Sequence, residues 1–327
     1  MSERRRIVPN LFVIGAAKAA SSSLHQWLAA HPDISGSRSD ETRFLMDPDD
    51  PLARPRGFAK TGLDGYGAFY PAAAGAARYV LDVTPMYYYQ DTARRVIPDL
   101  PGARAIFIAR RPSTRLKSLY DYARHNIGVL PDGIGFAEFL AEVEKGAASP
   151  VVGAHPMMRD ALDHCRYASH LRAWRDALGH DRLRLVVFED LVQDPGAAMA
   201  DLCGWLDLPA AVYDGYGFPA ANESYRVRNR LVHRIVRMAK RRFPPQLRRR
   251  ARTSYMSLNT QAGKEAASEA DRAAMARVDA ALADERDALA AMFGRDIPWP
   301  GAGAAADGTG RADAAAAGEA DIRVGGA

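Results

Sequence analysis

A lysine and three serines stand where a predicted strand gives way to a predicted helix. The strand is the apolar run LFVIG at 11–15, which is β-rich and ends in glycine. Lys18 follows it, and Ser21, Ser22 and Ser23 open a helical pattern. The N–H groups of a helix's first turn have no partner within the helix, and the helix dipole favours an anion there. The stretch therefore predicts an anion-binding loop, and a serine cap beside a solvated lysine is the simpler alternative.

The spacing of this loop differs from that of the common nucleotide-binding P-loop. That motif has a glycine, four residues and then Gly-Lys-Ser/Thr. Here Lys18 comes three residues after Gly15 and is followed by Ala19. We therefore expect a phosphate loop of a different pattern, which disfavours a P-loop kinase.

A second possible set of phosphate ligands follows another predicted strand, ARAIFIA at 103–109. Arg110 comes directly after it, and a helix is predicted over 112–126, with Ser118 about two turns from its start. An arginine can hold a phosphate through two parallel N–H bonds, and a serine on the adjoining helix can reach the same anion. The alternative is a surface arginine and an ordinary helical serine.

Strands and helices alternate along the chain, which is typical of an α/β protein with a parallel sheet. Further buried strands are predicted at 79–83 and 183–189, and further helices at 158–178 and about 263–293. We expect a three-layer fold in which a central parallel sheet is flanked by helices. It forms one domain over 9–299, whose portion from about 226 is mostly helical.

The positive charge of the chain is concentrated in one segment. The 327 residues carry a net charge of +5, yet 226–252 alone holds twelve Lys or Arg and no acid, so the remainder carries −7. This basic segment predicts an anionic partner. The candidates are the 3′-phosphate of a nucleotide, an anionic acceptor and an anionic membrane surface, and a solvated helix face is the alternative. We do not expect nucleic acid as a partner.

The two ends of the chain are not expected to belong to the domain. Residues 1–8 should be flexible, and the Ala/Gly-rich tail at 300–327 should be disordered.

No apolar run approaches the roughly 20 residues that cross a bilayer, and the start lacks a signal-peptide core. Cys165 and Cys203 have neither metal nor disulfide spacing, so we expect reduced, buried cysteines in a cytoplasmic protein.

The stretch PNLFVIGAAKAASSSLHQWLAAHPDI (9–34) resembles a known loop. It is similar to the 5′-phosphosulfate loop of sulfotransferases that use 3′-phosphoadenosine 5′-phosphosulfate (PAPS), in the branch of the heparan-sulfate enzymes and bacterial relatives. The resemblance implies a P-loop-like fold in which Lys18, Ala19 and the three serines hold the 5′-phosphosulfate. Ala20 stands where that family has glycine, so a positive φ there would carry a penalty of roughly 1–2 kcal/mol.

The second set of ligands resembles the same family's 3′-phosphate motif. That motif is a strand followed by Arg-x-Pro, with a serine eight residues after the arginine, and here these are Arg110, Pro112 and Ser118. The resemblance implies that Arg110 and Ser118 hold the 3′-phosphate of PAPS. Arg228, within YRVRNR, is a further candidate for contact with the nucleotide.

Transfer to an acceptor hydroxyl needs a base that takes its proton. The stretch SRSDETRFLM (37–46) resembles the family segment that carries the presumed base, which places Glu41 in that role. Asp82, in LDVTPMYYY, stands at an acidic position of the family and is the reserve candidate, and a solvated loop acid is the alternative for Glu41. No metal cluster is evident in the sequence, and none is expected.

The resemblance implies sulfuryl transfer from PAPS to a hydroxyl of a small-molecule, lipid or glycan acceptor. The rival interpretation is a degenerate, non-catalytic module of the same fold that binds a nucleotide or another anion. A P-loop kinase is a weaker rival. The sequence does not identify the acceptor or the oligomeric state.

Overall fold

The computed structural model describes residues 6–220, 225–227, 260–262 and 268–300. Its centre is a five-stranded sheet in the order β2-β3-β1-β4-β5, and every neighbouring pair of strands is parallel. The strands are β1 (Leu11–Gly15), β2 (Ile34–Gly36), β3 (Tyr79–Val83), β4 (Arg104–Ala109) and β5 (Leu183–Val187). Two short strands outside this sheet, β6 (Tyr225–Val227) and β7 (Thr260–Ala262), pair antiparallel.

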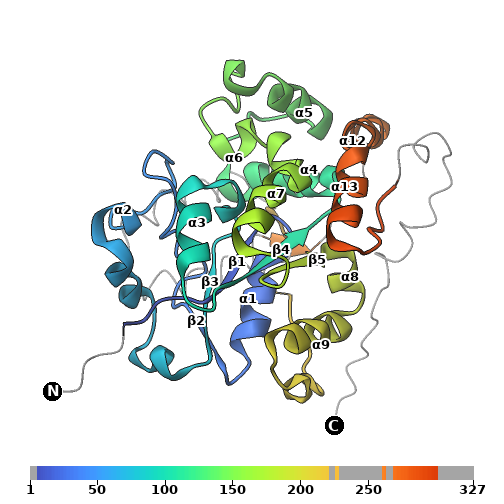
Figure 1. The fold of residues 1–327 in the computed structure, drawn as a ribbon. Helices are drawn as coiled ribbons and strands as arrows, with labels where there is room; N and C mark the ends of the chain where they lie inside the picture. Colours follow the sequence, from blue (N-terminus) through green and yellow to red (C-terminus); the bar gives the residue numbers. More distant parts are fainter. Residues whose placement is uncertain (1–5, 221–224, 228–259, 263–267, 301–327) are drawn as a thin grey trace, which may run out of the picture.

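Helices lie on both sides of the sheet, as Figure 1 shows. Among the described residues, the α-helices of seven residues or more are α1 (Ser21–Ala29), α4 (Pro112–Asp121), α5 (Phe136–Glu144), α7 (Tyr167–Leu178), α9 (Pro195–Leu206), α12 (Glu269–Ala281) and α13 (Ala283–Phe293). The shorter ones are α2 (Phe58–Thr61), α3 (Asp91–Val96), α6 (Pro156–Arg159) and α8 (Phe188–Gln193). The predicted three-layer α/β fold with a central parallel sheet is confirmed.

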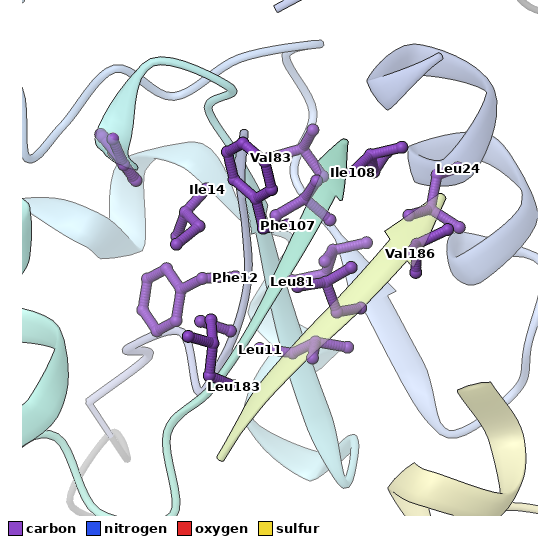
Figure 2. Packing of buried hydrophobic residues seen from close by; sticks show 14 of the residues in the cluster. Leu11, Phe12, Ile14, Leu24, Leu81, Val83, Phe107, Ile108, Leu183 and Val186 are labelled. Atoms are coloured by element: carbon purple, nitrogen blue, oxygen red, sulfur yellow. The ribbon is translucent and has the colours of Figure 1, made fainter. Parts of the chain in front are cut away.

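The central strands are buried on both faces, which explains why they read as continuous apolar runs. Every residue of β1 is buried. Figure 2 shows Phe12 and Leu183 on one side of the strands, and Leu24 and Val186 on the other. The first side also receives α7, whose Tyr167 ring packs against a phenylalanine of β4.

A second apolar cluster lies under α4, α5 and α12, away from the sheet. It includes Leu116, Leu119, Phe139 and Val278, all buried. The helix α12 thus packs against α4, and α13 packs against α7. The described part of the C-terminal portion is therefore attached to the same body as the sheet.

Most predicted elements agree with the structure, and one strand and two helices differ from their predicted bounds. The predicted strand at 183–189 ends at Val187, because Phe188 already begins α8. The single helix predicted over 158–178 is wrong: α7 begins only at Tyr167, since Arg166 has ψ of 63°, outside the helical region. The helix predicted over about 263–293 is two helices where it is described, α12 and α13.

None of the helices in these described ranges is both long enough and apolar enough to span a membrane. Cys165 and Cys203 are buried, as predicted. The N-terminal residues 1–5, most of the basic segment 226–252 and the tail 301–327 lie outside the described residues.

Candidate active site

The loop after β1 leads from the middle of the sheet into α1. It lies at the carboxyl end of a parallel strand, where open α/β sheets bind ligands. We call residues 15–23 the phosphate loop. Within it Lys18 has φ of 73° and Ala20 has φ of 62°, so both adopt the left-handed conformation. Ala20 is the N-cap residue of α1, and its side chain provides no hydrogen bond to the helix. The predicted penalty for alanine at this position therefore applies.

The serines occupy the first turn of α1 and do not form its N-cap. Ser21 and Ser23 are buried, and Ser22 is half-buried. Ala19, which precedes the cap, is fully buried. The simple serine cap considered above is thus wrong for this loop, because the cap residue is Ala20. The hydroxyls are instead gathered at the positive end of the helix dipole.

Arg110 joins the two predicted phosphate motifs. Its Nη1 donates to the backbone carbonyl oxygen of Lys18 at 2.7 Å, and its Nε donates to Thr114 Oγ1 at 3.2 Å. The guanidinium carbon lies 4.2 Å from the centre of the Phe188 ring. Arg110 follows β4 directly, so neighbouring strands deliver the arginine and the phosphate loop to the same edge of the sheet.

One face of the helical segment after Arg110 runs along this site. Thr114, Ser118 and Tyr122 are spaced four residues apart, so they lie on one side of α4 and its continuation. Thr114 contacts Arg110, and the Tyr122 ring centre lies 4.1 Å from Lys18 Nζ. Ser118, half-buried, lies between them along the helix. The three motif residues Lys18, Arg110 and Ser118 are therefore brought together.

Two neighbouring cations at this site lack an ion pair within the described residues. Neither Lys18 nor Arg110 has a described carboxylate within salt-bridge distance. Burial and then the charge of Arg110 lower the pKa of Lys18 to about 8. Burial also lowers the pKa of Arg110. Both residues are half-buried, and cations withdrawn from water are normally paired, so this arrangement is suited to an anionic ligand.

Glu41 lies within electrostatic reach of Lys18, whose pKa its charge raises slightly against the larger effect of burial. Its Oε2 accepts a hydrogen bond from Arg43 Nε at 2.8 Å, and its side chain is 30% exposed. Glu41 therefore faces solvent in part and remains accessible to an acceptor hydroxyl.

Asp82 is fully buried at the end of β3 and accepts hydrogen bonds from four hydroxyl groups. Burial raises its pKa to about 6, against the lowering effect of these hydrogen bonds. Because its oxygens are enclosed by the protein's own donors, Asp82 is poorly placed to receive a proton from an acceptor. Of the two candidate carboxylates, only Glu41 is partly exposed to solvent.

Two residues that support the site were missed by the sequence analysis. Arg115, only 1% exposed, donates from Nε to the carbonyl oxygen of Ala17 at 3.1 Å, beneath the phosphate loop. Asp279 of α12 accepts from Arg111 Nε and Ser113 Oγ, both at 2.8 Å, and so fixes the start of α4. No local pattern marks either residue, because each acts across a large sequence separation. Tyr122 could have been found from its spacing of four residues after Ser118.

The remaining predicted ligand, Arg228, lies outside the described residues. Within the residues that the structure covers, no group of three or more His, Cys, Asp or Glu side chains could hold a metal ion.

Comparison with known proteins identifies the relatives of this chain. No model of a known protein family matches it. It is 27% identical over 222 residues to heparan sulfate glucosamine 3-O-sulfotransferase 6 of Mus musculus, a match that covers 68% of this chain and 58% of that enzyme. It is 22% identical over 215 residues to bifunctional heparan sulfate N-deacetylase/N-sulfotransferase 1 of Caenorhabditis briggsae, covering 64% of this chain and 24% of that protein. The chain is related to the sulfotransferases.

A solved sulfotransferase from Alicyclobacillus acidocaldarius has the same fold. It superposes with a TM-score of 0.61 at 20% identity, covering 89% of this chain and 98% of that one. The resemblance stated from the sequence motifs and the sulfotransferase fold are both confirmed. This chain spans less than two thirds of the mouse enzyme and about a quarter of the nematode protein.

Proposed function

We propose that this sulfotransferase relative moves a sulfuryl group from PAPS to a hydroxyl of a small-molecule, lipid or glycan acceptor. One observation supports the proposal: Arg110 Nη1 lies 2.7 Å from the Lys18 carbonyl oxygen, so the two predicted phosphate motifs, 92 residues apart in sequence, lie together at one cationic site. The residues at this site fit a ligand with two anionic groups. Lys18 and Arg110 supply charge, Thr114 and Ser118 supply hydroxyls, and the first turn of α1 supplies N–H groups.

The proposed roles follow the two halves of the site. Lys18 and the loop residues Ala19 to Ser23 bind the 5′-phosphosulfate, and Arg110 with Ser118 binds the 3′-phosphate. PAPS supplies the activated sulfuryl group as a co-substrate. Arg228 stays a proposed nucleotide contact.

Glu41 is the proposed general base. As the acceptor oxygen bonds to sulfur, its proton passes to the Glu41 carboxylate, and the bond from sulfur to the 5′-phosphate oxygen breaks. Lys18 stabilises the negative charge that develops on the departing phosphate, where a donor held in place needs no rearrangement. Arg43, hydrogen-bonded to Glu41, orients the carboxylate.

The acceptor class remains a proposal. The names of the mouse and nematode relatives give heparan sulfate as their substrate. We therefore place glycans first among the acceptors to be tested, before lipids and small phenols or alcohols.

The proposal is tested by incubating the protein with ³⁵S-labelled PAPS and a panel of glycans, lipids and metabolite extracts, and by mass spectrometry for an added SO₃. Calorimetry with adenosine 3′,5′-bisphosphate measures nucleotide binding separately. Tight binding without transfer to any acceptor would favour a non-catalytic binding module. If the protein shows no nucleotide binding and no sulfuryl transfer, the proposed function is rejected.

The role of Glu41 is tested by Glu41→Gln against Asp40→Asn. Asp40 is the adjacent acid and is exposed, so the two changes remove equal charge from consecutive positions. Loss of a general base should lower kcat by roughly 10²–10⁴-fold in Glu41→Gln, with Asp40→Asn close to wild type. Equal activity of the two variants would remove Glu41 from the mechanism.

A further inference from the structure

A buried carboxylate lies behind the segment that carries Glu41. Asp82 accepts from Thr42 Oγ1 at 2.8 and 2.7 Å, from Thr84 Oγ1 at 3.1 Å, and from the hydroxyls of Tyr66 and Tyr87 at 3.0 Å each. All five side chains are completely buried. A carboxylate accepts and does not donate, and two oxygens provide about four sites, so the donors match its capacity.

Three of these hydroxyls also hold the backbone that follows Glu41. We call Thr42, Thr84 and Tyr87 the bridging hydroxyls, and residues 40–45 the base loop. The Tyr87 oxygen accepts from the N–H groups of Phe44 at 2.9 Å and Leu45 at 3.0 Å. Thr84 Oγ1 accepts from Arg43 N at 3.1 Å, and Thr42 Oγ1 accepts from Phe44 N at 3.3 Å.

The carboxylate fixes which way the bridging hydroxyls point. A hydroxyl has a single proton, and a backbone N–H can only donate. Once Tyr87 donates its proton to Asp82, its lone pairs face the two amide groups of the base loop. Chains of hydrogen bonds of this kind strengthen one another in a buried setting.

The base loop contains a strained residue that needs such support. Arg43 has φ of 51°, in the left-handed region. A non-glycine residue keeps that conformation when its surroundings over-determine it. Its N–H is held by Thr84, and its Nε binds Glu41 Oε2 at 2.8 Å. The conformation of Arg43 is therefore coupled to the orientation of the Glu41 carboxylate.

We propose that Asp82 is the positioning residue for Glu41, acting through the bridging hydroxyls to hold the base loop in its reactive arrangement. This inference rests on the proposed function, in which Glu41 is the base. Asp82 itself touches no substrate. Its buried charge orients Tyr87 and Thr84, these hold the N–H groups of residues 43–45, and Arg43 then orients Glu41.

Tyr66 provides a matched control for Tyr87. Both hydroxyls donate to the same oxygen, Asp82 Oδ2, at 3.0 Å, and both side chains are fully buried. Only Tyr87 also accepts from the base loop. Tyr87→Phe and Tyr66→Phe therefore delete the same group and the same hydrogen bond to Asp82. They differ in that Tyr87→Phe also removes the contacts with the base loop, namely with the N–H groups of residues 44 and 45 and with Thr42 Oγ1 at 3.1 Å.

The experiment compares these variants by kinetics and by amide hydrogen exchange. Tyr87→Phe should lower kcat roughly tenfold to a hundredfold, as expected for a misplaced catalytic group, with the KM for PAPS little changed. Exchange in the 43–45 peptide should accelerate. Tyr66→Phe should keep kcat within about twofold and leave that exchange as in wild type.

A second pair of variants tests the inference if Tyr87→Phe fails to fold. Thr84→Val should behave as expected for Tyr87→Phe, and Thr84→Ser should restore activity.

The outcomes separate this inference from the proposed function. Equal kcat and equal exchange in Tyr87→Phe and Tyr66→Phe, with an active wild-type enzyme, would overturn the inference and leave sulfuryl transfer intact. Absence of transfer in the wild type would reject the function on which the role of Glu41 rests. Hydrogen exchange would then still report whether the bridging hydroxyls hold the base loop.

Discussion

The phosphate loop and the base loop border the same proposed site, and arginines donate to backbone carbonyl oxygens in both. In the base loop Arg54 donates to Glu41 and Thr42. The two loops differ in how their N–H groups are used. Arginines hold the phosphate loop: Arg110 and Arg115 donate to the carbonyl oxygens of Lys18 and Ala17. Because arginine only donates, these contacts use none of the loop's N–H groups. The N–H groups of Ala16, Ala17 and Ala19 donate to backbone carbonyl oxygens, so the first turn of α1 is the part of the loop that presents N–H groups to a ligand. In the base loop, hydroxyls accept from the N–H groups of three consecutive residues, 43–45.

This difference follows the task proposed for each loop. A loop that recognises an anion through its backbone needs its N–H groups directed at the ligand. A loop that presents one side chain needs a rigid backbone, and its N–H groups can be used for support. The phosphate loop is therefore built for binding and the base loop for orientation, so substitutions in the two loops should have different effects.

After the loss expected for Glu41→Gln, the largest expected effect is on the phosphate loop. Lys18→Ala should lower kcat by roughly 10²–10³-fold, by analogy with the loss of one oxyanion donor. Lys60→Ala removes an equal charge from the exposed surface of α2 and should leave kcat unchanged. Steady-state assays with PAPS check both variants. More than half of normal turnover in Lys18→Ala would show that this loop is not used as proposed.

The contrast between the loops also explains which of them could be predicted from the sequence. The residues that form the phosphate loop are close together in sequence. The strand β1 was predicted with its observed bounds, 11–15, and Lys18 and the serines follow within eight residues. The contact between Arg110 and Lys18 was not predicted; it arises because neighbouring parallel strands deliver both residues to one edge of the sheet. The roles of these residues stay predictions.

The base loop depends on contacts that no local pattern records. Glu41 was found by resemblance, but its support comes from Tyr87 and Asp82, more than 40 residues away. A tyrosine in an apolar stretch is predicted to be buried. The sequence does not predict which buried carboxylate accepts the hydrogen bond of its hydroxyl. For the same reason Arg115 was missed, since a helical arginine is ordinarily exposed. Long-range pairing of buried polar groups requires the fold itself.

The second prediction concerns the carboxylate behind the base loop. The pKa of Asp82 is raised from 3.8 to about 6, so the folded protein keeps its proton in a range where the unfolded chain has lost it. Stability should therefore fall as pH rises from about 4 to 6. About two pKa units correspond to about 3 kcal/mol, a contribution that Asp82→Asn lacks.

Urea unfolding of wild type and Asp82→Asn between pH 4 and 7.5 measures this difference. The free energy of unfolding of wild type minus that of the variant should decrease as pH rises. Asp49→Asn, at an exposed position, should show no such trend. A difference that grows with pH would mean that Asp82 is stabilised as a charged group, and the account of its burial would be wrong.

The third prediction returns to the phosphate loop. The pKa of Lys18 is lowered to about 8, so its ammonium group loses its proton at mildly alkaline pH when no anion is bound. An anionic ligand favours the charged form. Affinity for adenosine 3′,5′-bisphosphate should therefore fall above about pH 8, at most tenfold per pH unit, with uptake of a proton on binding.

Calorimetry in two buffers of different ionisation enthalpy measures that proton uptake. Lys18→Met should bind more weakly and lose the dependence on pH, whereas Glu41→Gln in the base loop should largely retain it. Identical pH dependence in wild type and Lys18→Met would assign the titration to another group. It would also weaken the view that Lys18 is the phosphate loop's charged donor.

The smallest expected effect is at Ala20, where the phosphate loop keeps a strained residue. Its φ of 62° carries a penalty of roughly 1–2 kcal/mol for alanine and none for glycine. The greater freedom of glycine in the unfolded chain offsets about 0.4–1 kcal/mol of this. Ala20→Gly should therefore raise the free energy of unfolding by roughly 0.5–1 kcal/mol. Ala19→Gly, at a residue without positive φ, should lower it instead. Because glycine adopts a positive φ as readily as a negative one, Ala20→Gly should keep the shape of the loop and leave nucleotide affinity within about twofold. A large gain in affinity would show that the alanine opposes the conformation that binds the nucleotide.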